Sequence, residues 1–83
     1  MKVKYFAWVR ERIGKAEETI EPPASVRTVE DLIAWLTRRG ETYAYAFERP
    51  RMIRAAIDHA HVKAEAAIAG AREIAFFPPM TGG

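Results

Sequence analysis

Apolar and polar residues alternate in several stretches of the chain, and a period of two residues is typical of β-strands. The first stretch places Val3 and Tyr5 on one face and Phe6 and Trp8 on the other. The stretches that we interpret as strands are residues 2–9, 17–21, 52–57, 61–63 and 73–77. The first and last of them are apolar on both faces, which is typical of central strands.

A helical period follows Thr28, whose hydroxyl is placed to cap a helix while Asp31 completes a capping box. One apolar stripe is formed by Val29, Leu32, Ile33 and Leu36. We expect a helix of about three turns that stops at Gly40. A shorter helical turn is expected at residues 9–13, stopped by Gly14.

Two stretches have no single period. In residues 41–50, Tyr43 and Phe47 fit a helical i, i+4 pair, yet with Tyr45 they also alternate, so irregular chain and a short helix stay open. Residues 64–71 are rich in alanine and predict a loop. The order of elements predicts an α+β fold, a mixed sheet of four to five strands with one main helix on one face.

One helix covers only one face of such a sheet. The face that bears Phe6, Trp8 and Phe77 is therefore expected to be a partner-binding surface, because exposed contiguous apolar area usually marks a docking site. The alternative is that residues 41–50 fold over this face, as loops often do in small domains.

The composition narrows the possible functions. A chain of 83 residues is one small domain, and without cysteine it forms no disulfide and no zinc–thiolate site. Its 13 Lys and Arg are interspersed with 11 acids, which disfavours nucleic-acid binding. With no signal segment and no membrane span, we expect a cytoplasmic protein. Asp58, His59 and His61 lack a convincing further ligand, so no metal site is expected.

The chain ends in "FFPPMTGG", residues 76–83. We divide it into a domain, residues 1–77, and a flexible tail, residues 78–83. Six extended residues reach roughly 20 Å, enough to enter a pocket of another protein, and two glycines pass through a narrow channel. The α-carboxylate of Gly83 is a poor electrophile until it is activated, for example by adenylation. Sulfur could then replace an oxygen as a thiocarboxylate, which would let a chain without cysteine deliver sulfur.

The sequence resembles the family of molybdopterin synthase small subunits, which are ubiquitin-like β-grasp sulfur carriers. The resemblance rests on "VKYFAWVRERIG", "TVEDLIAWL", "AAID" and "EIAFFPPMTGG", which together span nearly the whole chain. It implies a helix across one sheet face and parallel first and last strands at the sheet centre. It also implies that Phe6 and Phe77 face the partner and that Pro78, Pro79, Met80, Thr81 and Gly82 insert into it.

The resemblance further implies the chemistry. An E1-like enzyme would use ATP to adenylate Gly83, and a sulfur donor such as a cysteine desulfurase or rhodanese-like protein would form the thiocarboxylate. The large synthase subunit, in a heterotetramer, would supply the catalytic side chains that move sulfur to cyclic pyranopterin monophosphate and build the dithiolene. The chain itself would bind no permanent cofactor and hold no independent active site.

Two stretches depart from the family pattern. Ile57-Asp58-His59 stands where Val-Asn-Gly or Val-Asn-Gln is common, and Gly70-Ala71-Arg72 replaces the usual Gly-Asp. These departures concern loop conformation and partner fit. Two other functions stay open: a sulfur carrier for thiamine, tRNA thiolation or cysteine synthesis, and an interaction module that uses only its sheet face.

Overall fold

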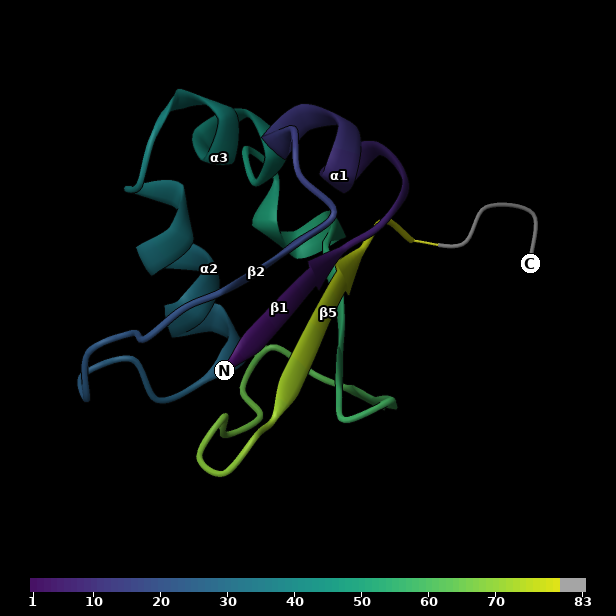
Figure 1. Cartoon of the computed structure of the whole chain (residues 1–83). Coiled ribbons are helices and arrows are strands. Elements are labelled where there is room, and N and C mark those ends of the chain that lie inside the picture. The colour runs from purple at the N-terminus through teal and green to yellow at the C-terminus, as the bar shows by residue number, and fades with distance from the viewer. Residues whose placement is uncertain (80–83) are drawn as a thin grey trace.

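The computed structural model describes residues 1–79, in which helices pack on one side of β-strands (Figure 1). Their order is β1 (Lys2–Tyr5), α1 (Ala7–Ile13), β2 (Glu17–Thr19), α2 (Val29–Thr37), α3 (Glu41–Ala46), the 3-10 turn η1 (Pro50–Met52), β3 (Arg54–Ile57), β4 (Ala60–Val62) and β5 (Glu73–Phe77). The expected α+β class is confirmed. The last predicted strand has the same bounds as β5.

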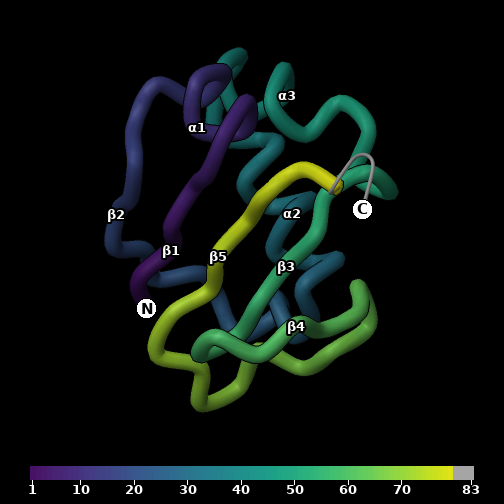
Figure 2. Tube along the Cα trace, turned by 90° about the vertical axis from the view of Figure 1, so that its right-hand side faces the viewer, coloured from purple at the N-terminus to yellow at the C-terminus, as the bar shows by residue number. Residues whose placement is uncertain are grey.

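The strands form one five-stranded mixed sheet in the order β2-β1-β5-β3-β4. Figure 2 shows the five strands side by side, with α2 behind them. β1 and β5 pair in parallel at the centre, with Val3 opposite Ile74 and Tyr5 opposite Phe76. β2 and β4 close the two edges as antiparallel strands. The arrangement of the first and last strands that the resemblance implied is therefore confirmed.

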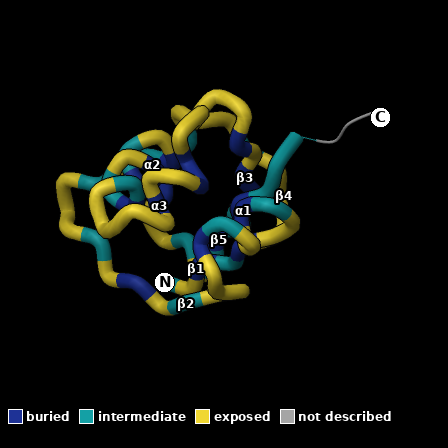
Figure 3. The backbone as a smooth tube through the Cα atoms, turned by 90° about the horizontal axis from the view of Figure 1, so that it is seen from above, coloured by how far each residue is buried: buried dark blue, intermediate teal, exposed yellow. Residues whose placement is uncertain are grey.

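The core lies between the sheet and the three helices. The largest fully buried side chains come from β1, β5, α1, α2 and the C-cap position of α3: Val3, Tyr5, Val9, Val29, Leu32, Leu36, Phe47, Ile74 and Phe76. Thr28 accepts a hydrogen bond from the Asp31 N–H, and Asp31 Oδ2 accepts one from the Thr28 N–H, so the predicted capping box is present. Figure 3 shows the buried segments gathered toward the inside and the connecting loops exposed.

The predicted first strand is too long. β1 ends at Tyr5, and Ala7 has a φ of 51°, which turns the chain out of the extended region and into α1. The reason is the pair Val9 and Ile13, which are one helical turn apart and both buried. Phe6 keeps extended backbone, but Trp8 lies on the helix, so Phe6 and Trp8 do not share a strand face.

Residues 41–50 lie on the helix side of the sheet and do not cover its other face. Tyr43, Ala46 and Phe47 are buried there, and the Phe47 ring meets the edge of Phe76 at 5.5 Å. The helical reading of this stretch is confirmed as α3. The stop expected at Gly40 is wrong, because α2 ends at Thr37 and Gly40 instead precedes α3 as its N-cap.

The side chain of Glu18 joins three elements on the helix side. Its carboxylate accepts hydrogen bonds from the hydroxyls of Tyr5 at 2.8 Å and Tyr43 at 2.7 Å, and Arg39 Nη1 lies 3.2 Å away. Burial alone would raise the pKa of Glu18, but these donors and Lys15 outweigh it and lower the pKa below its ordinary value. Burial and the Glu18 carboxylate raise the pKa of Tyr5, which keeps its hydroxyl protonated as a donor.

We expect Glu18→Ala to lower the free energy of unfolding by about 2 kcal/mol, because it leaves two tyrosine hydroxyls without their acceptor. Glu17→Ala is the matched control. Glu17 is paired with Lys2 at 3.3 Å, but both side chains are about half exposed, so the expected loss is below about 0.5 kcal/mol. Urea unfolding of both variants at pH 7 measures the difference, and equal losses would contradict the assignment.

The same network predicts a pH dependence. Because the pKa of Glu18 is lowered on folding, its stabilisation is present above the ordinary value of 4.5 and is lost as the pH falls through the folded value. The stability gap between the wild type and Glu18→Ala is therefore expected to shrink as the pH is lowered through this range. A gap that stays constant from neutral to strongly acidic pH would show that the carboxylate charge contributes nothing.

The two departures from the family pattern contact each other. Asp58 and His59 form the two-residue turn between β3 and β4, with φ of 46° and 74°, as a type I′ turn requires. Asp58 Oδ1 accepts hydrogen bonds from the backbone N–H groups of Arg72 at 3.1 Å and Glu73 at 2.9 Å. The turn is thereby tied to the start of β5, and the register between β3 and β5 is regular.

His59→Gly is expected to raise the free energy of unfolding by up to about 1 kcal/mol, because glycine adopts a φ of 74° without the steric cost that a Cβ brings. His59→Val is the opposing control and is expected to destabilise, since a β-branched residue is a strong outlier at positive φ. Thermal unfolding of the two variants gives the comparison. A His59→Gly variant less stable than His59→Val would contradict the turn geometry.

Candidate functional site

The sheet face opposite the helices is uncovered within residues 1–79, and we call it the open face. Strand alternation and cross-strand pairing assign its residues, since the neighbours on each strand are buried against the helices. They are Lys2 and Lys4 of β1, Glu17 and Thr19 of β2, Arg54 and Ala56 of β3, His61 of β4, and Glu73, Ala75 and Phe77 of β5. Figure 2 looks onto this face.

The open face is charged at one end and aromatic at the other. At the start of β5, Glu73 pairs with Lys4 at 3.4 Å. At the end of β5, Phe77 is opposite Arg54 and meets the His61 ring edge-on at 5.2 Å. Phe6 adjoins this end, because its N–H donates to the Phe76 carbonyl at 3.0 Å and its side chain is 45% exposed. The structure thus brings Phe6 and Phe77 to the same end of the sheet.

Ala56 and Ala75 pair directly between the charged and aromatic ends. Both have small side chains, and Ala56 is buried while Ala75 is partly exposed, so the pair forms a low floor between the two ends. Sequence reasoning missed this floor, because alanine carries no strong strand or surface signal. The cross-strand register is what places the two residues together.

The chain leaves the domain from the aromatic end of the open face. Pro78 and Pro79 follow Phe77 directly and are partly exposed. Figures 1 and 3 show the described chain leading outward from the end of β5. The other predicted tail residues, Met80, Thr81, Gly82 and Gly83, lie outside the described residues.

Trp8 occupies a different surface from Phe77. It lies on α1, is partly buried, and packs against the Arg12 guanidinium at 4.5 Å. The Arg12 guanidinium also lies 4.1 Å from the centre of the Tyr45 ring. It donates hydrogen bonds to the Tyr45 carbonyl and to the Glu48 carboxylate. The strand position predicted for Trp8 is wrong, and its role in partner binding stays a prediction.

The two histidines lie in different elements, His59 in the turn between β3 and β4 and His61 on β4. The His61 ring meets Phe77 edge-on, whereas His59 occupies a turn position with positive φ. Among residues 1–79, no three His, Asp or Glu side chains are grouped closely enough to hold a metal ion. In the same part of the chain, no helix has the length and apolar character needed to cross a membrane.

Comparison with known proteins places this architecture. The model of the ThiS family matches residues 3–83. The chain belongs to the ThiS family. Two relatives, from Haemophilus influenzae and Escherichia coli, are each 35% identical over 83 residues, covering 100% of this chain and 99% of theirs. Both carry the name molybdopterin synthase sulfur carrier subunit, so the resemblance seen in the sequence is confirmed.

Solved structures of this kind share the fold. A candidate molybdopterin converting factor subunit 1 from Pyrococcus furiosus superposes with a TM-score of 0.73 at 28% identity, and 95% of each chain is covered. SAMP1 from Haloferax volcanii superposes with a TM-score of 0.72 at 24% identity, covering 100% of this chain and 98% of that one, which shows a common fold alone. The family member described here is therefore a ubiquitin-like β-grasp domain, as the sequence predicted.

Proposed function

We propose that this ThiS-family chain is the sulfur carrier subunit of a molybdopterin synthase and that Gly83 carries the sulfur. The observation that supports this most strongly is the full-length identity of 35% to two proteins of that name. The family match also extends through residue 83, so it includes the Gly-Gly end. The outward course of Pro78 and Pro79 is consistent with a terminus that reaches a partner's active site.

The proposed chemistry takes place at the α-carboxyl group of Gly83. This carboxylate is ionised at neutral pH and does not accept nucleophiles, because its pKa lies near 3.5 in free chains. An E1-like enzyme attaches AMP from ATP to the carboxylate and releases pyrophosphate. The terminal sulfur of a donor persulfide then attacks the acyl adenylate, and AMP leaves, so that donor and carrier are joined through an acyl disulfide. A thiol supplies the two electrons that break its S–S bond. This frees the thiocarboxylate and leaves the donor sulfur and the thiol joined as a disulfide. The chain has no cysteine, so its own side chains offer no thiolate for this sulfur.

The open face supplies the docking surface in this proposal. The large synthase subunit packs on its aromatic end, formed by Phe6 and Phe77, while residues 78–83 enter that subunit's active site. Catalytic side chains belong to the large subunit, and the assembly is a heterotetramer with two carriers. Because the tail starts at the edge of the docking surface, binding of the surface positions the thiocarboxylate for transfer to cyclic pyranopterin monophosphate.

The pathway is tested by identifying the molecule that accepts the sulfur. The thiocarboxylated chain is mixed with the large subunit and cyclic pyranopterin monophosphate, and mass spectrometry follows the carrier and the pterin. We expect the carrier to return to its carboxylate form while the pterin gains two sulfur atoms. Parallel reactions offer a thiamine-thiazole synthase or a tRNA-thiolating enzyme with its substrate. Transfer in one of those reactions alone would keep the carrier chemistry and reject the molybdopterin pathway.

A further inference from the structure

A second surface lies on the helix side of the molecule, between α2, η1 and strands β3 and β4. Three adjoining depressions there share Ile33 and Pro50, and the one nearest β4 has a volume of about 340 Å³. Together they form one elongated groove, which runs from Val62 and Lys63 along α2 to Thr37 and Arg38. We call it the α2 groove.

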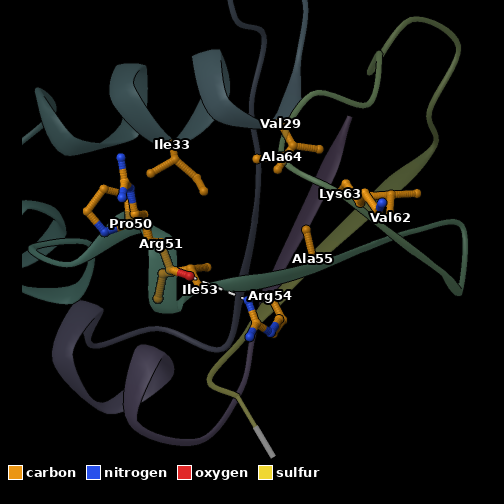
Figure 4. A pocket seen from close by; sticks show the side chains of 10 residues that line it. All are labelled: Val29, Ile33, Pro50, Arg51, Ile53, Arg54, Ala55, Val62, Lys63 and Ala64. Atoms are coloured by element: carbon orange, nitrogen blue, oxygen red, sulfur yellow. Dashed lines mark hydrogen bonds between the residues drawn. The ribbon is translucent and has the colours of Figure 1, made fainter.

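The floor of the α2 groove is apolar. Val29 and Ile33 of α2 face Ile53 and Ala55 across it, and all four side chains are buried. Figure 4 shows Val29 and Ala64 on one side of the depression nearest β4 and Ile53 and Ala55 on the side of β3. An aliphatic side chain placed there would contact several apolar neighbours, and its apolar surface would be removed from water.

The rim of the α2 groove is basic. Arg51, Arg54 and Lys63 line it and are exposed, and within residues 1–79 none of the three is part of an ion pair. Arg54 Nη1 bonds to the Arg51 carbonyl, which keeps these two cations together (Figure 4). Two acids also line the groove: Glu30, and Glu48, which pairs with Arg12 at 3.3 Å.

The apolar floor and the basic rim of the α2 groove indicate which kind of ligand fits it. An apolar floor beside unpaired cations complements a ligand that combines aliphatic and negatively charged groups. The elongated shape, which follows α2 from Val29 to Arg38, suits a polypeptide segment better than a compact metabolite. We propose that the α2 groove binds an extended segment of a partner protein in which one or two aliphatic side chains are flanked by Asp or Glu.

This inference does not depend on the proposed function. The apolar floor of the groove is on the helix side, whereas the aromatic end of the open face is on the other side of the sheet. Arg54, opposite Phe77 at the edge of both surfaces, is the one residue named for the two. A partner held by the α2 groove therefore leaves Phe6, Phe77 and the start of the tail accessible. The groove would let a second protein hold the carrier while the tail is engaged elsewhere.

Nuclear magnetic resonance of the ¹⁵N-labelled full chain tests the groove directly. The probes are four synthetic peptides with a central Ile, Leu, Val or Met flanked by Asp and Glu, titrated to about 1 mM. We expect at least one to shift the amide signals of Ile33, Arg51, Ile53 and Lys63 and not those of Phe77. Peptides with Lys in place of the acids are expected to bind at least about 10-fold more weakly.

Paired variants separate a specific groove from general attraction. Arg51→Glu/Lys63→Glu is expected to weaken binding at least about 10-fold, whereas Arg10→Glu/Arg27→Glu, which changes the net charge equally outside the groove, leaves it within about 2-fold. Ala64→Phe fills the groove and is expected to block binding, while Ala60→Phe on the exposed edge strand does not. Two-dimensional spectra of each variant establish that it is folded.

Three outcomes would overturn the proposal. The first is that none of the four peptides shifts the groove signals at about 1 mM. The second is that the lysine peptides bind as well as the acidic ones. The third is that the groove signals respond to vesicles of anionic phosphatidylglycerol and not to the peptides, which would assign the basic rim to a lipid surface.

Discussion

Deletion of Gly83 is expected to reduce sulfur transfer to the pterin by at least about 100-fold. The truncated chain ends on Gly82, and one residue of extended backbone spans about 3.5 Å, whereas a displacement of about 1 Å in a reacting group already costs about 100-fold in rate. An alanine appended after Gly83 displaces the carboxyl group in the opposite direction and is expected to fail as well. The reconstituted transfer reaction measures both.

Folding of these variants provides the control. The described core ends at Phe76, so the unfolding midpoint is expected to stay unchanged in both. Met80→Leu, which alters the tail but keeps Gly82 and Gly83, should retain transfer. If deletion of Gly83 leaves transfer intact, the carboxyl group of Gly83 is not the group that carries the sulfur, and the proposed role of this residue is contradicted.

Phe77→Asp is expected to weaken binding of the large synthase subunit by about 30-fold or more, as loss of a central aromatic anchor commonly does. Its ring is the part of β5 that the open face presents beside His61 and Arg54. A carboxylate at this position would have to lose its water on docking. Calorimetric titration of the large subunit with the carrier gives the affinity.

A second variant, Phe6→Asp, separates loss of binding from a folding defect in Phe77→Asp. Phe6 occupies the N-cap position of α1 and is 45% exposed, and aspartate is among the preferred residues at that position. Phe6→Asp should therefore keep or improve stability while weakening binding at least about 10-fold. Thr19→Asp, on the charged end of the same face beside Lys2, is the matched control and should bind normally. Equal affinities of all three variants for the large subunit would show that the aromatic end is not part of the interface.

The elements that could be predicted from the sequence are those whose local signals agree with one another. In β5, Ile74 and Phe76 alternate with outward residues, and two prolines end the strand, so its bounds were clear. In α2, the capping pair Thr28 and Asp31 marks the start and an uninterrupted apolar stripe continues from it. Gly40 misled the prediction of the end of α2, since a glycine is equally suited to precede the next helix.

The errors arose where two periods overlap or where the decisive contact is distant in the sequence. Residues 6–9 alternate like a strand, while Val9 and Ile13 follow a helical period, and the positive φ of Ala7 decides between them. An alanine gives no sign of such a backbone. The Glu18 network joins residues 13 and 25 positions apart, so no local pattern could reveal that this edge-strand acid anchors two tyrosines.

The candidate site was predictable in part for the same reason. The sheet positions of Phe6 and Phe77 followed from alternation, and the structure places both at one end of the open face. The alanine floor and the edge-on contact of His61 with Phe77 depend on the register between β3, β4 and β5, which residue types alone do not specify. Trp8 was misplaced because its strand did not extend that far.

The central claim is that the carboxyl group of Gly83 is a chemically loaded, transferable acyl group. Intact-mass analysis of the full chain after incubation with ATP, an E1-like adenylyltransferase, a persulfide-bearing sulfur donor and a thiol reductant tests it most directly. The account predicts a mass increase equal to the exchange of one oxygen for one sulfur, located in the C-terminal fragment and absent when ATP is omitted. An unchanged mass with every activating enzyme of this class, or a gain of sulfur that does not require ATP, would contradict it.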